Sequence, residues 1–255
     1  RSGISEYAFI NFTTPNLEDI SYMFSYSNIE IFELKGLNFS NVKNMSHLFE
    51  ECNSLLSIET KDFKTENVED MSYMFKSVSS MYYFDLTSFD TSNVLYMNNM
   101  FQFCNSLYFL SINNFNTKNV KDMSYMFDSC FSLGSINTKI LNTQNVLYMD
   151  SMFTYCNSLS ELDLSKFNTE NVLSSKKLFS NCESLSLTAG NFSCTFLSLK
   201  NFLAQSITFF LKAKILLASV GFFSDISSII LLPVLKSAKA SAKSSSLTFA
   251  SSIAG

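Results

Sequence analysis

The chain has 255 residues, 47% of them hydrophobic, which is enough for one large domain or two small ones with a substantial core. Its six glycines and two prolines are too few for a collagen-like, low-complexity or turn-dense β-sandwich protein. The net charge of −4 provides no basic field for a phosphate backbone, so we expect no nucleic-acid partner.

The N-terminal residues already resemble part of a repeat. The chain opens with Arg1, and no basic-then-apolar leader precedes the first repeat-like residues. The segment ISEYAFINF, residues 4–12, fits the second half of the unit described below. We therefore expect a processed chain or a fragment, whose export route cannot be inferred from these residues.

The dipeptide Asn-Val recurs every 26 residues. Its copies begin at Asn41, Asn67, Asn93, Asn119, Asn145 and Asn171, and a related Asn16-Leu17 lies 25 residues before the first. A period between about 20 and 50 residues indicates a solenoid or array, in which each unit buries its apolar face against its neighbours.

The first half of each unit has the spacing of a short helix. Its apolar side chains stand at offsets 0, 3, 6, 7 and 10, as in Val120, Met123, Met126, Phe127 and Cys130. At 100° per residue they share an arc of about 120°. The asparagine before the valine suits a helix N-cap. We therefore predict a short helix in this half of every unit.

The second half of each unit has the alternation of a short strand. In LSELDLSKF, residues 159–167, Leu162 and Leu164 alternate with polar residues, as in a strand with one buried face. The fold class predicted is α/β, a leucine-rich-repeat-like solenoid. Stacked strands lie about 4.8 Å apart, whereas packed helices need about 8–10 Å. We therefore expect a bent stack with parallel strands on the concave side and short helices on the convex side.

These units resemble a known family. The pattern F-N-T-x-N-V-x-x-M-S-x-M-F-x-x-C-x-S-L-x-x-L-D-L, which covers about residues 4–185, is similar to the repeat of BspA-like leucine-rich-repeat surface proteins. The same repeat occurs in bacterial lipoproteins of undefined function. The resemblance implies a cell-surface or extracellular protein that binds a protein or glycan on a host or neighbouring cell. It implies no catalytic residue.

Most copies carry a cysteine three residues after the repeated phenylalanine, at Cys52, Cys104, Cys130, Cys156 and Cys182, whereas Cys194 lies outside the pattern. A metal site is one interpretation, but ligands spread one per coil do not converge. Disulfides are another, but we expect helices to hold the Cα atoms beyond the limit of about 7 Å. We favour a column of small buried thiols, because Ser27 and Val78 occupy the same position in other units.

The sequence contains few groups for catalysis. The single histidine, His47, stands where other units have Tyr22, Asn99 or Lys177, so we expect it on a solvated face. A nucleophile-histidine arrangement would depend on this residue alone. No phosphate-binding, nucleophile-elbow or zinc-protease motif occurs. We predict that the protein is not an enzyme and uses no cofactor and no metal.

Two sets of strand positions are candidate partner-binding residues: the aromatic set Tyr82, Tyr83, Tyr108 and Phe109, and the acidic set Glu33, Glu59, Asp85 and Asp163. Exposed aromatic side chains with a polar rim concentrate interface energy, although one or two of these rings could instead turn into the core. Carboxylates stacked about 5 Å apart repel by about 1 kcal/mol in water. One carboxylate per coil gives calcium too few oxygens, so a screened acidic face is the simpler interpretation.

Residues 186–255 break the repeat. They hold one acidic residue, Asp225, six lysines, and no Met, Tyr, Glu or His. The apolar run 215–235 is long enough to span a bilayer, although Asp225 opposes insertion. The tail is therefore a helical cap on the last coil, spurious or disordered sequence, or a membrane anchor.

We predict two regions. Residues 1–185 form a solenoid of about seven units, the first one truncated, and residues 186–255 form an atypical tail that is mostly helical or disordered. The function predicted is a binding or adhesion module that presents its concave strand face to a protein or glycan. Two alternatives are a structural spacer of a larger surface protein and the scaffold part of a surface enzyme. Membrane contact is expected only through residues 215–235.

Overall fold

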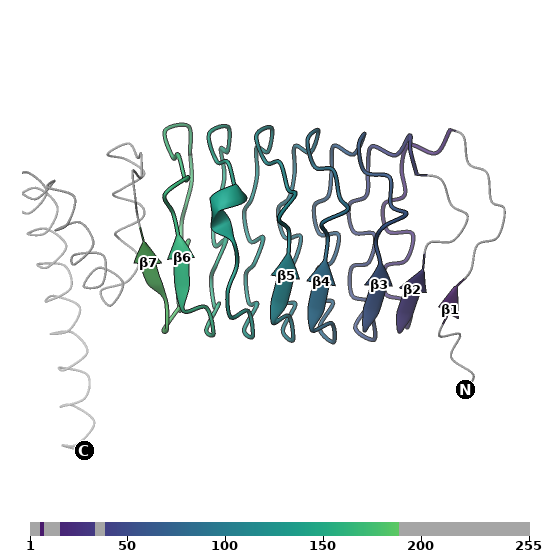
Figure 1. The fold of residues 1–255 in the computed structure, drawn as a ribbon, viewed down its shortest axis with the longest axis horizontal. Coiled ribbons are helices and arrows are strands. Elements are labelled where there is room, and N and C mark those ends of the chain that lie inside the picture. Colours follow the sequence, from purple (N-terminus) through teal and green to yellow (C-terminus); the bar gives the residue numbers. More distant parts are fainter. Residues whose placement is uncertain (1–5, 8–15, 34–38, 189–255) are drawn as a thin grey trace, which may run out of the picture. The chain divides into compact units, whose positions relative to one another are not determined.

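The computed structural model describes residues 6–7, 16–33 and 39–188 (Figure 1). The chain divides into two compact units, residues 1–205 and 206–255, and every described residue belongs to the first. Cys194 and the apolar run 215–235 lie outside the described residues, so the boundary at 185 and the interpretations of the tail stay predictions. Within the described ranges, no helix is both long and apolar enough to cross a membrane.

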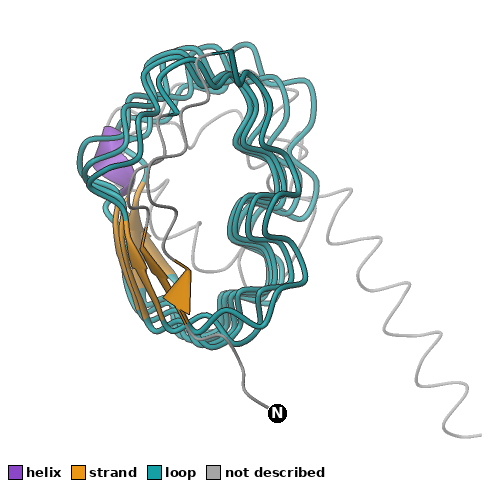
Figure 2. Ribbon diagram, turned by 90° about the vertical axis from the view of Figure 1, so that its right-hand side faces the viewer, coloured by secondary structure: helices purple, strands orange, loops and turns teal. Residues whose placement is uncertain are grey.

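The described part of the first unit winds into successive coils, each lying against the next (Figures 1 and 2). Short strands lie on one side of the coils: β1 Glu6–Tyr7, β2 Ile31–Glu33, β3 Ser57–Glu59, β4 Tyr83–Asp85, β5 Phe109–Ser111, β6 Glu161–Asp163 and β7 Ser186–Thr188. The coil between β5 and β6 instead carries η1, a 3-10 helix of Thr138–Ile140.

All strand pairs are parallel and in register with the repeat. The strands form the sheets β1-β2-β3, β4-β5 and β6-β7. The buried Phe32 lies opposite Ile58, and the buried Phe84 lies opposite Leu110. Single parallel bridges form a second ladder elsewhere in the coil, through Asp19, Asn44, Asp70, Tyr96, Asp122, Tyr148 and Ser174. Backbone pairing therefore joins the coils at two places around their circumference.

The predicted short helices are wrong: in the described coils, the first half of each unit is a series of turns. Within a coil, the Glu50 N–H donates to the His47 carbonyl at 3.1 Å. Between coils, the His47 N–H donates to Ser72 O at 2.9 Å and the Phe49 N–H donates to Met74 O at 2.8 Å. Two residues in each of these segments, such as His47 and Glu51, have φ near +60°, which a right-handed helix excludes.

The turns remove the predicted cause of curvature. A helix would satisfy its own N–H groups and need about 8–10 Å from its neighbour, whereas these turns pair with the next coil as strands do, at about 4.8 Å. Because both sides of the coil have this spacing, no mismatch bends the stack, and the described coils stand in a row (Figure 1). We name the two sides of the coil by their local structure: a strand face, the side of β2–β6, and a turn face, formed by residues 20–27 and their equivalents. The predicted concave and convex sides stay a prediction.

Identical side chains stack on one another inside the coils. One phenylalanine from each coil contributes to a column whose neighbouring ring centroids lie 5.4–5.8 Å apart, with planes within 15°: Phe24, Phe49, Phe75, Phe101, Phe127, Phe153 and Phe179. The repeated Val and Met positions, such as Val120, Met123 and Met126, are fully buried beside it. The core is thus a set of like-on-like columns.

Four thiols of the cysteine column, those of Cys52, Cys104, Cys130 and Cys156, are buried as predicted, Cys182 at its end is partly exposed, and all five are free. Each thiol also donates a hydrogen bond to a carbonyl of the preceding coil, as Cys104 does to Phe75 O and Cys130 to Phe101 O, both at 3.1 Å. The position therefore favours a small donor as well as a small volume. The helical spacing that was expected to keep the cysteines apart is absent from these turns.

The asparagine before each valine also has a role that differs from the prediction. Instead of capping a helix, the Asn93 side chain donates to Glu66 O at 2.8 Å, and Asn119 donates to Ser92 O at 2.7 Å. Thr91 Oγ1 bonds in the opposite direction, to Asn116 O in the following coil at 3.2 Å. These side chains join neighbouring coils where the backbone does not pair.

Candidate partner-binding surface

The outward residues of the strand face form three columns that run from coil to coil. The first column is Glu30, Leu56, Tyr82, Tyr108, Gly134 and Ser160; the second is Ile31, Ser57, Tyr83, Phe109, Ser135 and Glu161; the third is Glu33, Glu59, Asp85, Ser111, Asn137 and Asp163. The strand register brings equivalent residues of neighbouring coils together, as Tyr83 with Phe109. The residue between the second and third columns, such as Phe84, faces the core.

The four predicted aromatic residues form one cluster, which we call the aromatic patch. Tyr82, Tyr83, Tyr108 and Phe109 are 53%, 50%, 41% and 51% exposed, so none of them turns into the core. The Tyr82 and Tyr108 rings stack with centroids 5.2 Å apart and planes at 6°. Phe109 lies edge-on to Tyr108, with a centroid distance of 4.6 Å. The patch is therefore an ordered group of rings.

The backbone of the coils sets this arrangement. Tyr108 and Phe109 both donate their N–H groups to Tyr82 O, at 3.0 and 3.2 Å, which brings the two coils into register. On the other side of Tyr108, a Cβ built on Gly134 would lie 3.5 Å from the ring, so the tyrosine ring rests against this glycine. The column of rings therefore ends at Gly134, where no side chain continues it.

Two aliphatic residues extend the patch and were not among the predicted site residues. Leu56 is 57% exposed in the first column and Ile31 is 45% exposed in the second, in the two coils that precede Tyr82. Alignment of the position before each strand could have identified Leu56, since it is the equivalent of Tyr82 and Tyr108. The hydrophobic part of the strand face thus extends over four coils.

Three of the four predicted acidic residues lie in neighbouring coils beside the patch. Glu33 and Glu59 are direct register partners in β2 and β3, and Asp85 occupies the same position in the next coil. Lys61 approaches Glu59 at 3.5 Å. The pKa of Asp85 lies below its usual value, because the Thr87 hydroxyl and N–H both donate to Oδ1 and the Tyr83 side chain adds a smaller effect. Asp85 therefore stays ionised beside the rings at any physiological pH.

Asp163 is separate from this group. It stands three coils beyond Asp85, and the coils between them carry Ser111 and Asn137 in the same column. Hydrogen bonds from Ser165 lower the pKa of Asp163, with Lys139 at 3.2 Å contributing less. The structure thus places Asp85 on the same strand as Tyr83, Glu59 one coil and Glu33 two coils before it, and Asp163 three coils beyond it.

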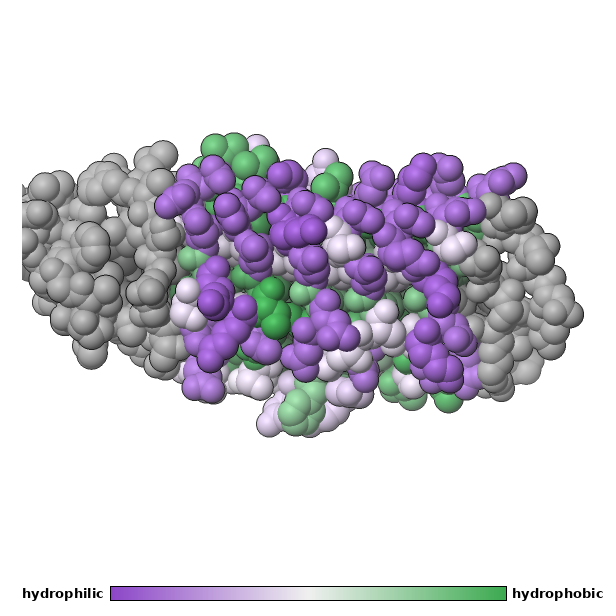
Figure 3. All heavy atoms as spheres, turned by 45° about the horizontal axis from the view of Figure 1, so that its top comes forward, coloured by the Kyte–Doolittle hydropathy of each residue, from purple (hydrophilic) through white to green (hydrophobic). Residues whose placement is uncertain are grey.

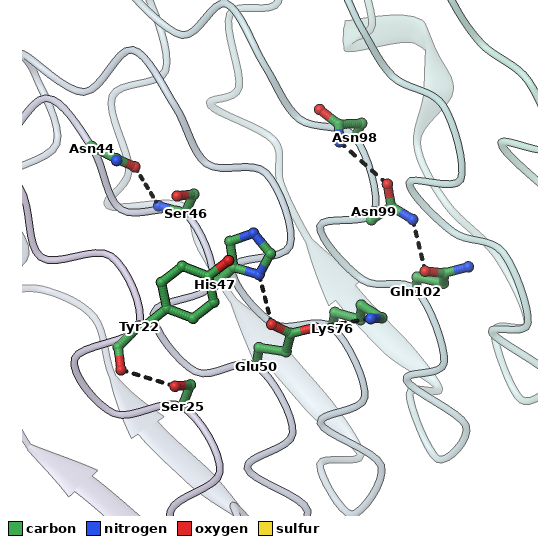
Figure 4. Close-up of polar contacts among 10 residues, drawn as sticks. All are labelled: Tyr22, Ser25, Asn44, Ser46, His47, Glu50, Lys76, Asn98, Asn99 and Gln102. Atoms are coloured by element: carbon green, nitrogen blue, oxygen red, sulfur yellow. Dashed lines mark hydrogen bonds and ion pairs between the residues drawn. The ribbon is translucent and has the colours of Figure 1, made fainter.

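The prediction that His47 lies on a solvated face is wrong. Its ring is stacked between the rings of Tyr22 and Tyr73, with centroids 4.2 and 4.4 Å away, and its side chain is only 18% exposed. Figure 4 shows the Tyr22 side of this stack. The reason is the turn geometry, which stacks equivalent side chains of successive coils. His47 Nδ1 lies 2.6 Å from the Glu50 carboxylate.

Glu50 connects this stack to the next coil. Its second oxygen accepts a hydrogen bond from Lys76 Nζ at 2.9 Å (Figure 4). Burial tends to raise the pKa of Glu50, but the hydrogen bonds from Lys76 and His47 outweigh burial, and the pKa is lowered. This network is a cross-coil link on the turn face.

Other exposed aromatic residues of the described coils, such as Tyr26, Tyr96 and Tyr148, lie outside the aromatic patch. No three or more His, Cys, Asp or Glu side chains gather to hold a metal ion in the described ranges. The face in Figure 3 is mostly hydrophilic, and hydrophobic atoms appear on it as separate small areas. The aromatic patch is therefore the candidate site.

The comparison with known families covers these coils. The family model described as "Mycoplasma protein of unknown function, DUF285" matches residues 18–131 and residues 105–209, which together span well over half of the chain. The chain belongs to this family. Every residue of the aromatic patch lies within the DUF285 matches. No curated protein matches the sequence.

Proposed function

We propose that this chain is a non-enzymatic binding module, which attaches to a protein or glycan partner through its strand face. The observation that carries the proposal is the aromatic patch, four half-exposed aromatic residues on two neighbouring coils, of which Tyr82, Tyr108 and Phe109 have rings in mutual contact. Exposed Tyr and Phe side chains lose little conformational entropy on binding and contribute large contact areas, so they concentrate binding energy.

The columns themselves indicate that these rings are not needed for folding. Equivalent positions in other coils hold Ser57, Ser135 and Ser160, which fit the same backbone. A residue that faces solvent can therefore be polar here without loss of coil stacking. Large apolar groups at such positions favour a binding role over the alternative of a structural spacer.

The alternative of a surface enzyme has less support in the described coils. His47, the single histidine of the chain, is held between two tyrosine rings, and its Nδ1 is engaged by Glu50. These contacts support a stabilising role for this residue. An enzymatic activity would depend on residues elsewhere.

We also propose that the protein is of the BspA-like leucine-rich-repeat type and acts at the cell surface. The support is the resemblance of its 26-residue unit to that repeat, together with membership of DUF285. Brief protease treatment of intact cells should remove the chain while a cytoplasmic marker survives. Protection of the chain until the cells are lysed would contradict surface display.

The binding proposal is tested by screening the full chain against immobilised glycans and against host-surface protein fractions. Replacement of Tyr82, Tyr83, Tyr108 and Phe109 by alanine should abolish binding to whatever is captured. The matched control replaces Tyr96 and Tyr148, which are 44% and 42% exposed at the ladder of single bridges. Thermal unfolding of both variants verifies that the coils stay stacked.

The outcomes are distinct. Loss of binding in the patch variant alone supports the proposal. Equal binding by the patch variant and wild type would move the site away from the patch, and the absence of any ligand in both screens would favour the structural spacer.

A further inference from the structure

We infer that the partner docks a basic protein segment on the strand face, with arginine or lysine side chains lying across the aromatic patch. This inference rests on the proposed binding function and names the chemistry of its partner. Two independent observations carry it: the charge of the columns and the way the rings stack.

The first observation is that every charged residue in the three columns is acidic: Glu30, Glu33, Glu59, Asp85, Glu161 and Asp163. Within β2 and β3, Glu33 faces Glu59 directly, an arrangement of like charges that destabilises a strand pair. Lys61 approaches Glu59 at 3.5 Å, and the Lys61 side chain is 70% exposed. A cationic ligand would relieve this repulsion, whereas an anionic one would increase it.

The second observation concerns the ring faces. Tyr82 and Tyr108 stack on each other, and the far face of Tyr108 rests against Gly134. A sugar recognised by aromatic stacking needs a free ring face, and three of the four faces of this ring pair border another ring or the glycine. The pair therefore has one open ring face, that of Tyr82, and otherwise presents ring edges and hydroxyl groups, which an extended peptide can contact along the strands.

One partner side chain can contact both the aromatic rings and an acidic residue, because the two lie on the same face of β4. Tyr83 and Asp85 are two residues apart on β4, so their side chains leave the same face of the strand. An arginine or lysine can lay its aliphatic stem against the rings and pair its charged head with this carboxylate. Asp85 keeps its charge because Thr87 stabilises the ionised form.

The test uses blocked synthetic peptides and the full chain. The probe alternates arginine with leucine; its analogues carry glutamate or glutamine in place of arginine. We expect the arginine peptide to bind wild type, binding to weaken with added salt, and both analogues to bind at least about tenfold more weakly.

Two variants locate the effect. Glu59→Gln with Asp85→Asn should weaken arginine-peptide binding about tenfold, since the amides keep the local hydrogen-bond acceptors but remove both charges. The matched control is Glu161→Gln with Asp163→Asn, which also removes one glutamate and one aspartate charge, from the second and third columns outside the patch, and should leave the affinity unchanged.

Other results overturn the inference. Equal binding of the arginine and glutamate peptides, or equal weakening by the two variants, would remove the basic-segment assignment. Capture of a glycan that depends on the aromatic patch but not on Glu59 and Asp85 would also refute it, yet would leave the proposed binding function intact. The proposed binding function fails in a different experiment: ligand binding would survive the replacement of Tyr82, Tyr83, Tyr108 and Phe109 by alanine.

Discussion

The turn face and the strand face of the same coils follow different rules. On the turn face, the recurring positions repeat from unit to unit: NVKDMSYMFDSC and NVLYMDSMFTYC, at residues 119–130 and 145–156, share the Asn, the Val, both Met, the Phe and the Cys. On the strand face, the first column changes from Leu56 to Tyr82 to Gly134. A residue which stacks on its own copy is thus restricted, whereas an outward residue beside it is free to vary.

The restriction has a physical origin. Each inner Phe of the buried column, such as Phe127, contacts the Phe of the coils on both sides, and each thiol bonds to a carbonyl of the preceding coil. A change at one coil therefore disturbs two interfaces. The strand-face columns carry no such penalty, and there the chain can hold groups chosen for a partner.

The largest expected difference is between two phenylalanines of neighbouring repeats, in the stability that the folded chain loses when each is replaced by alanine. Phe127→Ala removes a fully buried ring between Phe101 and Phe153 and should lower the free energy of unfolding by about 3–5 kcal/mol. Phe109→Ala, at a 51% exposed ring, should cost less than about 1 kcal/mol. Urea unfolding measures both, and similar losses at the two positions would erase the distinction between the faces.

Alkaline pH should lower the free energy of unfolding, because the thiols of the turn face ionise more readily in the unfolded chain. Burial raises the pKa of Cys104, Cys130 and Cys156 well above the ordinary value, and raises that of Cys182 to about 11. Above about pH 9 the unfolded chain therefore binds fewer protons than the folded chain, so stability falls as pH rises, by up to about 1.4 kcal/mol per pH unit for each thiol. Below about pH 8 the thiols are protonated in both the folded and the unfolded chain, so they contribute no pH dependence to the free energy of unfolding.

Urea midpoints between pH 7 and pH 10 measure this slope. The variant Cys130→Val with Cys156→Val, which copies the natural Val78 of the same column, should have a shallower decline, because Tyr and Lys titrate equally in both proteins. An unchanged slope would mean that the thiols are not buried as described.

A weaker effect tests the backbone of the turns. Lys177 is exposed and has φ of 57°, a conformation in which glycine has no steric penalty. Lys177→Gly should therefore raise stability by about 0.5–1 kcal/mol, while Lys176→Gly, next to it and without positive φ, should lower stability by a similar amount. Thermal unfolding of both variants gives the comparison, and destabilisation by both would argue against the turn geometry.

Much of the strand face could be predicted from the sequence, because the 26-residue period fixes which residues are equivalent. Parallel register then brings Tyr83 beside Phe109 and Glu33 beside Glu59, as the structure has them. The outward direction of the four aromatic side chains could not be settled by alternation alone. Leu56 was missed because only aromatic and acidic side chains were predicted as candidates, although it occupies the position equivalent to Tyr82 and Tyr108.

The turn face could not be predicted in the same way. Offsets such as those of Val120, Met123 and Phe127 describe which side chains are buried, and they are equally compatible with a helix or with turns. The deciding energy comes from N–H groups that pair with the next coil, as His47 does with Ser72, and this pairing exists only in the stack. The same pairing brought His47 between two tyrosine rings, which no local pattern indicates.

The division between the two faces is best tested by hydrogen exchange of the full chain with and without a captured partner. We expect binding to slow exchange in peptides covering residues 56–59, 82–85 and 108–111, while residues 71–78 and 97–104 on the turn face exchange as before. Slowing confined to those turn residues, with no change at β4 and β5, would refute the assignment of the strand face as the binding surface.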